Sequence, residues 1–370
     1  MQKVYIAEFD TCDMAFQGEL IKSKLYALSS INMIEITYNI EDADLIIFNA
    51  NCACTIDSIK YSIGYFTALL GMKKESAKTI LTGCMARNFK SKHSYLNNVD
   101  KWLKENFDYI YDTNDYQKLL YDLFPGVDFG NAFGGVTMAE PEVADIFVSN
   151  GCNNLCTFCK ATFMQFNLKS MSLDKFKHYV DLAVSNGAKA IRINGTNIAQ
   201  LGLDTVGRSL MPEFLEYVHQ KNEIEEISLA GLAFKDAIEH NLDDVIREYK
   251  KIISINGSIE SGSNNLLKLM NKGITREEII EFMYKIRQRH YVYLYTNIIS
   301  GFPTETLEDI DKTILLLSCV RPKRVVVSSY VDSPFVASHN LPQLTQEEIN
   351  SHTDIYKSEL KRIRIPARFQ

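Results

Sequence analysis

Short apolar runs alternate with amphipathic stretches through the first third of the chain. Strands are predicted at residues 4–9, 34–38, 45–48 and 79–82, and helices at residues 18–28 and 56–70. Strands that alternate with helices form a parallel sheet with helices on its faces. The pattern therefore predicts an α/β fold that begins with a flavodoxin-like parallel-sheet domain.

The alternation resumes after residue 144 with a longer period. Strands are predicted at residues 145–148, 190–194, 226–229, 252–255, 293–299 and 324–328. Helices are predicted between them at residues 174–186, 212–221, 242–250, 276–289 and 307–320. This order indicates a (β/α)6 partial TIM barrel, in which chemistry is expected at the carboxyl ends of the strands.

The stretch between these two blocks, residues 124–140, is rich in glycine and has no apolar period, which is typical of a linker. We therefore expect an N-terminal domain at 1–123, a linker at 124–140, a core at 141–340 and a helical tail at 341–370. The segment 357–368 is basic, because it contains five basic residues and one acidic residue, Glu359. This segment could contact phosphates or an acidic peptide, and a solvated helix end explains it equally well.

Composition narrows the class of protein. The chain has 370 residues, of which 46% are hydrophobic and 23% charged, enough to bury a sizeable core and too apolar for a disordered chain. Its apolar runs are strand-length and its start lacks a signal-peptide pattern, so we expect a cytoplasmic protein without a membrane partner. A net charge of -6 argues against a surface that coats nucleic acid, although a local basic patch stays possible.

Three of the eight cysteines form a C-x3-C-x2-C motif at Cys152, Cys156 and Cys159, in the loop after the first predicted barrel strand. A zinc site usually shows two C-x2-C pairs or a histidine at short range, and the nearest downstream histidine is His178. Three thiolates suit an iron–sulfur cube, in which each iron takes one external ligand and one iron stays open to a small molecule. Three buried, hydrophobe-like cysteines are the structural alternative.

Three further cysteines, Cys12, Cys52 and Cys84, each follow a strand of the first domain. The carboxyl ends of parallel strands meet at one edge, so these thiols could converge into a second cluster. Cys54 is the rival ligand, and we assign Cys52 because it lies closer to the strand end. Three separate buried thiols remain an alternative, and Cys319, in an apolar helix, is expected to pack in the core.

The triad, with the aromatic Phe158 inside it and a βα series after it, resembles the radical S-adenosylmethionine superfamily. Downstream, the segments Glu-Ser-Gly-Ser-Asn at 260–264, Leu-Lys-Leu-Met-Asn-Lys-Gly at 267–273 and Asn-Ile-Ile-Ser-Gly-Phe-Pro-Thr at 297–304 are similar to the methylthiotransferase family. So is Thr-Gly-Cys-Met-Ala-Arg at 82–87. The resemblance covers nearly the whole chain.

This resemblance implies two [4Fe–4S] clusters and S-adenosylmethionine as methyl donor and radical source. The C-x3-C-x2-C triad would hold the cluster whose open iron chelates S-adenosylmethionine. Cys12, Cys52 and Cys84 would hold an auxiliary cluster that carries the sulfur to be transferred. A 5'-deoxyadenosyl radical would abstract hydrogen from an unactivated carbon, and the product would carry a methylthio group.

No catalytic residue is assigned beyond the cluster ligands. By position, contacts to S-adenosylmethionine are expected from Phe158, Gly195, Thr196, Asn197, Glu260, Ser261 and Asn297. A glycine after the second barrel strand lets the backbone approach a ligand closely. A helix-capping role for Glu260 and Ser261 is equally open, and Asn297 could instead pack inside the barrel.

Family members that act on tRNA or a ribosomal protein usually continue into a small β-barrel TRAM domain, which we expect this chain, ending at Gln370, to lack. The sequence also departs from the family pattern after Cys159 and at residues 229–234, which hold no acidic residue or proline. We therefore expect a peptide or protein side chain as substrate, including a ribosomally made peptide, with tRNA as the alternative.

Two further alternatives stay open. One is a radical enzyme that inserts sulfur without methylation, and the other is a non-catalytic iron–sulfur redox protein. For either radical reaction, the resemblance implies an electron donor such as flavodoxin or ferredoxin.

Overall fold

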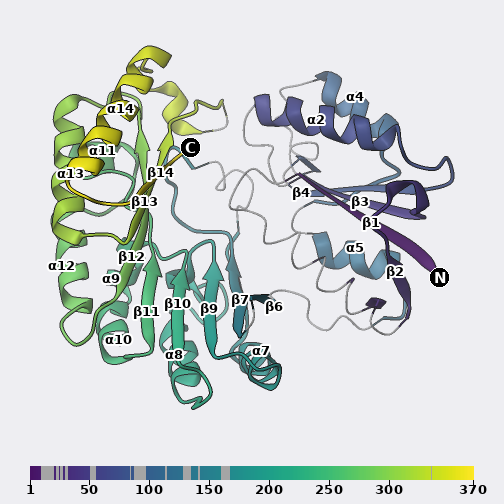
Figure 1. Cartoon of the computed structure of the whole chain (residues 1–370), viewed down its shortest axis with the longest axis horizontal. Coiled ribbons are helices and arrows are strands. Elements are labelled where there is room, and N and C mark those ends of the chain that lie inside the picture. Colours follow the sequence, from purple (N-terminus) through teal and green to yellow (C-terminus); the bar gives the residue numbers. More distant parts are fainter. Residues whose placement is uncertain are drawn as a thin grey trace. The chain divides into compact units, whose positions relative to one another are not determined.

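The structure is a computed structural model that describes residues 1–9, 21, 25, 28–29, 32–50, 56–83, 85–86, 97–112, 115–127, 135–140, 142–159, 167–334 and 336–370. The chain divides into two compact units, Met1–Thr137 and Met138–Gln370, which Figure 1 shows with their elements labelled. Among the described helices, none combines the length and the apolar composition that a bilayer span requires.

The first unit is built on five parallel strands in the order β2-β1-β3-β4-β5. Their bounds are β1 Gln2–Phe9, β2 Ile34–Ile36, β3 Leu45–Ala50, β4 Lys78–Gly83 and β5 Tyr109–Ile110. This is the strand order of flavodoxin-like folds, so the predicted fold class is confirmed. Every residue of the central strand β3 is buried, as expected for a strand covered on both faces.

Helices cover this sheet as the alternation predicted. Helix α2 spans Ile56–Leu70, as expected, and Phe66 on it meets Phe48 of β3 edge to face with ring centroids 5.0 Å apart. Phe107 meets the same Phe48 ring at 5.2 Å. Of the helix predicted at 18–28, only positions 21, 25 and 28 are described, and all three are buried and helical.

In the described part of the first unit, four elements were not predicted: the strand β5, the helices α4 (Asn97–Asn106) and α5 (Tyr116–Leu123), and the short 3-10 helix η1 (Ile40–Asp42). Helix α4 is polar over most of its length, and its fully buried apolar residue is Leu103. Its apolar residues Val99, Trp102 and Leu103 nevertheless have helical spacing, as do Tyr116, Leu119, Leu120 and Leu123 of α5, so both helices carried a period that the prediction overlooked.

The second unit is a mostly parallel sheet in the order β14-β13-β12-β11-β10-β9-β7-β6, with a short strand β8 (Lys169–Ser170) antiparallel to β7. Six of its strands are those predicted, within a few residues at each end. They are β7 Val143–Asn150, β9 Ala190–Gly195, β10 Glu226–Ala230, β11 Ile252–Asn256, β12 Tyr293–Ser300 and β13 Arg324–Ser329.

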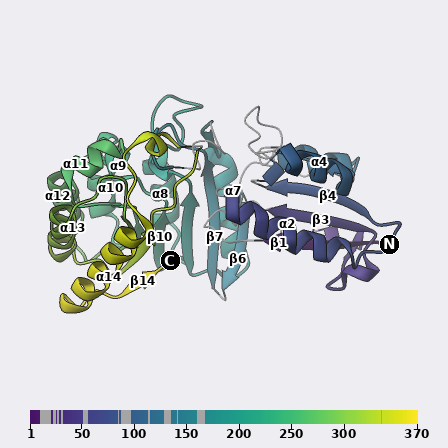
Figure 2. The same ribbon diagram turned by 90° about the horizontal axis from the view of Figure 1, so that it is seen from above.

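Helices follow these strands and lie outside the curved sheet, as Figure 2 shows for α12 and α13. Five of them were predicted: α7 Leu173–Ser185, α8 Met211–His219, α10 Leu242–Glu248, α12 Arg276–Ile286 and α13 Leu307–Val320. Two six-residue helices were missed, α9 (Phe234–Glu239) and α11 (Asn264–Leu269). Such short helices contain fewer than two turns and therefore show no apolar period.

Two expectations about the ends of this unit are corrected. The stretch predicted as a linker at 124–140 ends in a strand, β6 (Gly135–Glu140), that joins the second sheet. The predicted helical tail at 341–370 contains helix α14 (Gln346–Arg362) and also a strand, β14 (Ala367–Phe369), which pairs with β13. The neighbour of β14 is remote in sequence, which periodicity does not reveal, whereas β6 lies next to β7 both in the sheet and along the chain and was missed because its stretch is rich in glycine.

A buried carboxylate fixes α14 to the rest of the unit. The hydroxyl of Tyr356 donates to Glu305 Oε1 at 3.1 Å, while Oε2 accepts from the Gly301 amide at 2.6 Å and lies 2.9 Å from His352 Nδ1. The hydrogen bond to Glu305 raises the pKa of His352. The tail is therefore part of the core of this unit.

The carboxyl ends of β9 and β10 approach each other so closely that one position accepts only glycine. Gly231 has a left-handed φ of +84°, and a Cβ there would lie 1.9 Å from the Gly195 carbonyl oxygen. Its own carbonyl accepts from Ile198 N at 2.9 Å. Gly231 therefore fixes the distance between two strand ends.

We predict that Gly231→Ala lowers the free energy of unfolding by about 2 to 5 kcal/mol, because it adds a steric clash to the left-handed backbone penalty. Urea unfolding followed by circular dichroism measures the loss. Gly187→Ala is the matched control, since Gly187 has φ +85° and open space around its Cβ position. It should lose only about 1 to 2 kcal/mol, and equal losses in both variants would contradict the close approach.

Candidate functional site

The loop that carries the cysteine triad, residues 151–159, follows β7 at the carboxyl end of the second sheet and is tied to distant segments. The amide of Thr157 donates to the Met270 carbonyl at 3.0 Å, and its own carbonyl accepts from Ser338 N at 2.9 Å. Asn271 Nδ2 donates to the Leu155 carbonyl at 2.8 Å. Backbone bonds on both sides therefore hold the loop in one position.

Phe158, the aromatic residue inside the motif, packs against other aromatic side chains of the second unit. The ring of Phe158 meets Phe302 edge to face at 6.5 Å, and Phe302 meets Tyr330 in the same way at 5.6 Å. These rings belong to an apolar cluster with the buried side chains of Leu266 and Met270. Phe158, expected as a cofactor contact, therefore also anchors the loop.

The three thiols of the triad are free and partly buried. Burial raises the pKa of Cys152, and it raises the pKa of Cys156 to about 11. The charges of Cys152 and Cys159 each act on Cys156, and the positive charge of Lys272 opposes them. The electrostatic effects of Cys152 and Cys159 on Cys156 indicate that the three predicted thiols lie near one another.

The surroundings of Cys152 fit a thiolate bound to iron. Its Sγ accepts from the Asn154 amide at 3.3 Å and from Asn197 Nδ2 at 3.4 Å. Hydrogen bonds to sulfur are one of the means by which proteins tune iron–sulfur clusters. In the described part of the chain, no three metal-ligating side chains converge as a single ion would require. A cube differs from a single ion because its cysteines bind separate irons.

A buried carboxylate organises the amides behind the triad. Asp236, 3% exposed, accepts from Asn154 Nδ2 at 2.5 Å, from Asn197 Nδ2 at 2.8 Å and from Gln200 Nε2 at 3.0 Å. Gln200 Oε1 in turn accepts from the Asn153 amide at 2.8 Å. A buried charge is stable only when such donors satisfy it. Asp236 therefore fixes the amide that donates to Cys152.

The predicted segment 195–197 lies against this loop. A Cβ on Gly195 would lie 2.4 Å from Ser149 Oγ, so strand packing alone requires this glycine. Thr196 Oγ1 accepts from the Gly151 amide at 3.3 Å. Asn197 is buried, and its Oδ1 has no hydrogen-bond partner among the described residues. An unpartnered acceptor beside Cys152 suits a ligand that donates a hydrogen bond.

The predicted residues Glu260 and Asn297 both form side-chain hydrogen bonds with Ser258. Glu260 has a left-handed φ of +69° and pairs with β12 through its backbone, donating to the Asn297 carbonyl at 2.9 Å. Asn297 Nδ2 donates to Ser258 Oγ at 3.3 Å. Burial raises the pKa of Glu260, and Lys272, 3.7 Å away, opposes that rise. Ser258 and Lys272 also line a narrow cleft with Cys156.

Ser261, expected as a cofactor contact, is fully buried and faces helix α13. Its Oγ lies 3.3 Å from Thr313 Oγ1 and accepts from the Ser263 amide at 3.1 Å. The residue that caps α11 is Ser263, whose Oγ accepts from Leu266 N. The hydroxyl of Ser261 is therefore engaged within the fold.

The thiols predicted for the auxiliary cluster, Cys12, Cys52 and Cys84, lie outside the described residues, as does the rival Cys54. The strands that precede them are described. Phe9, Ala50 and Gly83 end β1, β3 and β4 and are register partners across three adjacent parallel strands.

The edge formed by these three strand ends also holds an unpartnered polar side chain. Asn49 is 1% exposed, and neither its Oδ1 nor its Nδ2 has a hydrogen-bond partner among the described residues. A buried polar group without a partner is unusual and suits a bound group.

Sequence reasoning missed several residues of the site. Asp236 and Gln200 lie on a short helix and a short 3-10 turn that no period reveals. Residues 229–234 hold no acidic residue, and Asp236 lies just beyond them. Lys272 lies in segment 267–273, whose similarity to the methylthiotransferase family could have identified it as a residue of the site. Cys319, expected to pack in the core, is exposed on α13.

Comparison with known families finds a match to the radical SAM superfamily over residues 146–317. Among curated relatives, threonylcarbamoyladenosine tRNA methylthiotransferase MtaB of Aquifex aeolicus (strain VF5) is 28% identical, over 90% of this chain and 82% of the relative. Ribosomal protein uS12 methylthiotransferase RimO of Thermosipho africanus (strain TCF52B) is 26% identical, over 89% and 77%. The tRNA-2-methylthio-N(6)-dimethylallyladenosine synthase of Acetivibrio thermocellus is also 26% identical, over 77% and 62%.

Solved structures with a similar fold include radical SAM enzymes. The methyltransferase TsrM from Kitasatospora setae superposes with a TM-score of 0.59 at 11% identity, covering 92% of this chain and 77% of that one. The cobalamin-dependent enzyme OxsB gives 0.55 at 12% identity, with 98% and 56% coverage. At these identities the likeness concerns the fold.

We predict that Asp236→Asn lowers the free energy of unfolding of the apo-protein by about 1 to 3 kcal/mol, because an amide replaces an acceptor that satisfies three donors. Urea unfolding measures the change. Asp204→Asn is the control, since that exposed carboxylate accepts from Ser170 N at 3.0 Å. Its loss should stay below about 1 kcal/mol. Equal losses in the two variants would contradict a stabilising role for the hydrogen bonds that the three amides donate to Asp236.

We further predict that Cys156 of the apo-protein reacts slowly with iodoacetamide at pH 8, and about tenfold faster per pH unit up to pH 10, because its pKa is raised to about 11. Mass spectrometry of tryptic peptides measures the rate. Lys272→Gln should slow the reaction at pH 9, since Lys272 lowers that pKa, while Lys268→Gln should not. A rate that levels off near pH 9 would contradict the burial of this thiol.

Proposed function

The chain belongs to the radical S-adenosylmethionine superfamily and is homologous to its methylthiotransferases, and from this we propose that it inserts a methylthio group at an unactivated carbon of a peptide or protein side chain. The observation that carries the reaction is the triad loop at the carboxyl end of the second sheet, with two N–H donors on Cys152 Sγ. Such donors stabilise a thiolate that is bound to iron.

In this proposal Cys152, Cys156 and Cys159 hold a [4Fe–4S] cluster. When bound, the cluster and S-adenosylmethionine supply the electron transfer and radical chemistry. The protein orients and shields them, since Asn197 is fixed by Asp236 and presents a free Oδ1 as an acceptor. Phe158 packs against Phe302 on the barrel side and so holds the loop in place.

Five of the predicted residues lie in or near the triad loop without being used only for packing. We propose that these residues bind S-adenosylmethionine; they are Phe158, Thr196, Asn197, Glu260 and Asn297. Glu260 is buried beside Lys272, so its carboxylate is available as an acceptor for ribose or amino groups. Gly195 and Ser261 act through packing in this proposal, because each is engaged within the fold.

The auxiliary cluster is proposed on Cys12, Cys52 and Cys84. The register of β1, β3 and β4 supports it, since the three strands that precede these cysteines end side by side. The unpartnered, buried Asn49 at the same edge also supports a bound group there. The sulfur carried by this cluster would be the one transferred.

A protein side chain is favoured as substrate by the net charge of -6, because a mainly negative surface repels a polyanion outside any local basic patch. It is also favoured by similarity to RimO, whose name gives a ribosomal protein as substrate. The second candidate substrate is tRNA, because MtaB and the dimethylallyladenosine synthase, which are 28% and 26% identical to this chain, are named for tRNA. In either case we propose a flavodoxin or ferredoxin as the electron donor.

We predict that anaerobic protein binds about eight irons per chain, and that Cys156→Ala and Cys84→Ala each bind about four. With S-adenosylmethionine and dithionite, Cys156→Ala should lose 5'-deoxyadenosine formation by about a hundredfold or more, since an iron ligand is removed. Cys84→Ala should keep that activity and lose the methanethiol that the wild type releases on acid quench.

Cys319→Ala is the matched control, because it removes an exposed cysteine outside both sites. It should retain full iron content and both products. A wild type that binds about four irons, or a Cys84→Ala variant that still releases methanethiol, would contradict the auxiliary cluster. Mass spectrometry of protein and tRNA fractions after the reaction then distinguishes the two substrates by where the methylthio mass appears.

A further inference from the structure

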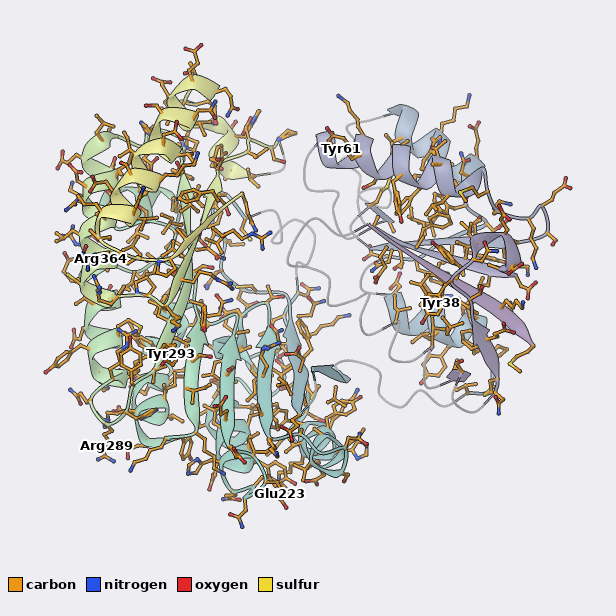
Figure 3. All side chains as sticks on the ribbon, viewed as in Figure 1. Tyr38, Tyr61, Glu223, Arg289, Tyr293 and Arg364 are labelled. Atoms are coloured by element: carbon orange, nitrogen blue, oxygen red, sulfur yellow. The ribbon has the colours of Figure 1, made fainter. Side chains whose placement is uncertain are left out.

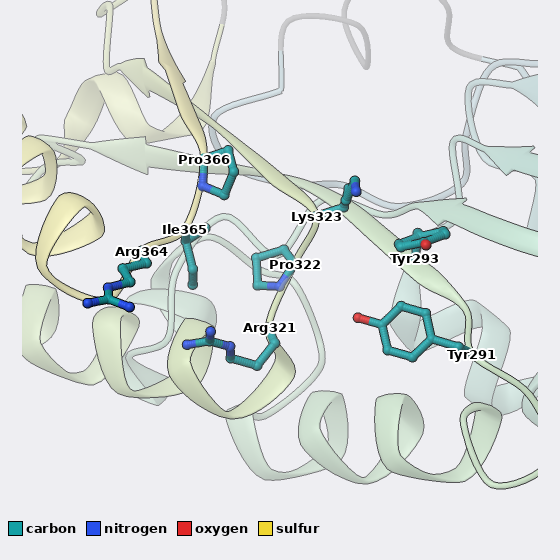
Figure 4. Close-up of a pocket in the computed structure, with 8 residues that line it drawn as sticks. All are labelled: Tyr291, Tyr293, Arg321, Pro322, Lys323, Arg364, Ile365 and Pro366. Atoms are coloured by element: carbon teal, nitrogen blue, oxygen red, sulfur yellow. The ribbon is translucent and has the colours of Figure 1, made fainter.

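A hollow of about 530 Å³ lies at the amino-terminal end of the second sheet, remote from the cysteine triad along the strands. It is formed where the chain enters β12, β13 and β14 from the helices before them. Figure 4 shows the residues that line it, which are Tyr291, Tyr293, Arg321, Pro322, Lys323, Arg364, Ile365 and Pro366. Nothing in the proposed reaction uses this end of the sheet.

The hollow carries positive charge without a counter-charge. Arg321, Lys323 and Arg364 are exposed, none of the lining residues is acidic, and no carboxylate among the described residues pairs with these three. By contrast, the nearby Arg289 and Arg362 are paired with carboxylates. Unpaired cations gathered in one place are notable in a chain of net charge -6.

The two arginines occupy equivalent turns. Arg321 ends α13 and Arg364 follows α14, both have left-handed backbones with φ of +46° and +58°, and a proline follows each turn. Glycine or asparagine is the usual residue in this conformation, because other side chains are strained there. Arg321 Nη1 donates to the Ile363 carbonyl at 3.3 Å, which links the two turns, and strain kept at both positions supports a use for these side chains.

Exposed aromatic rings border the cations. Tyr291 is 58% exposed and Tyr293 38% exposed, and their rings meet edge to face at 5.0 Å. The ammonium of Lys323 lies 5.0 Å from the centre of the Tyr293 ring. Figure 3 places Tyr293 and Arg364 along one flank of the second unit. Arginine, lysine and tyrosine side by side are typical of surfaces that bind single-stranded RNA.

We propose that this hollow binds the phosphate backbone of single-stranded RNA, with Arg321, Lys323 and Arg364 contacting phosphates and the tyrosines offering a surface to a base. The guanidinium fork suits phosphate oxygens, and the aromatic face accepts any base. Each tyrosine ring meets a cation, Arg287 for Tyr291 and Lys323 for Tyr293, both at 5.0 Å. An acidic peptide would satisfy the cations but has no base to stack on the exposed parts of these rings. The proposal goes beyond the proposed reaction and does not depend on it.

The test is fluorescence anisotropy of a short, fluorescein-labelled single-stranded RNA with the full-length holoenzyme, without S-adenosylmethionine, over a range of salt. We predict that the double variant Arg321→Gln and Arg364→Gln binds at least tenfold more weakly. The slope of log affinity against log salt should fall by about 0.7 for each phosphate that the variant no longer neutralises. Tyr293→Ala should weaken binding about fivefold or more without changing that slope.

The matched control is the double variant Arg289→Gln and Arg362→Gln, which removes two exposed arginines that are already paired. It should bind within about twofold of the wild type, since those charges are neutralised. Lys323→Gln, at a position of ordinary backbone, repeats the test if the first double variant unfolds. Formation of 5'-deoxyadenosine should be unchanged in all of these variants, which separates this proposal from the reaction.

Two results would overturn the proposal. One is an unchanged affinity in folded Arg321, Arg364 and Lys323 variants. The other is a labelled poly-glutamate peptide that binds as tightly as the RNA and loses affinity in the same variants, which would identify an acidic-peptide site instead.

Discussion

The candidate site depends on one loop, residues 151–159, being held at the carboxyl end of the second sheet by donors and acceptors from segments remote in sequence. Thr157 bonds to the end of α11 and to Ser338, and Asn153 and Asn154 bond to Gln200 and Asp236. Because these contacts come from several sides, the three thiols keep one arrangement before any cofactor binds.

Two buried carboxylates beside this loop are stabilised in different ways. Asp236 is satisfied by three neutral amides, which keep its negative charge close to Cys152 and also orient Asn197. Glu260 instead has the cation of Lys272 at 3.7 Å, and burial raises its pKa. Each carboxylate would destabilise the fold if its partners were removed, since an unpaired buried charge is costly. Their positions at the mouth are therefore tied to the stability of the unit.

The two ends of the second sheet differ in chemistry. The carboxyl end gathers thiols, amides and buried carboxylates, whereas the amino end gathers exposed arginine, lysine and tyrosine side chains. In barrels of this kind the amino end usually serves stability. Here the turn between α14 and β14 forms part of that end, and its backbone is held because β14 pairs with β13. The cluster of exposed cations at the amino end can therefore serve as a binding surface, because the backbone that carries it is fixed.

Periodicity and short-range spacing along the chain were enough to predict the two parallel sheets, the six barrel strands and the position of the triad, because each of these depends on residues close together in sequence. They did not predict the roles of Asp236 and Gln200, or the strands β6 and β14. Short helices and edge strands show no period, and hydrogen bonds between residues 36 to 82 apart exist only once the strands are side by side. The hollow at the amino end likewise arises because three separate turns converge, and that convergence exists only in the folded chain.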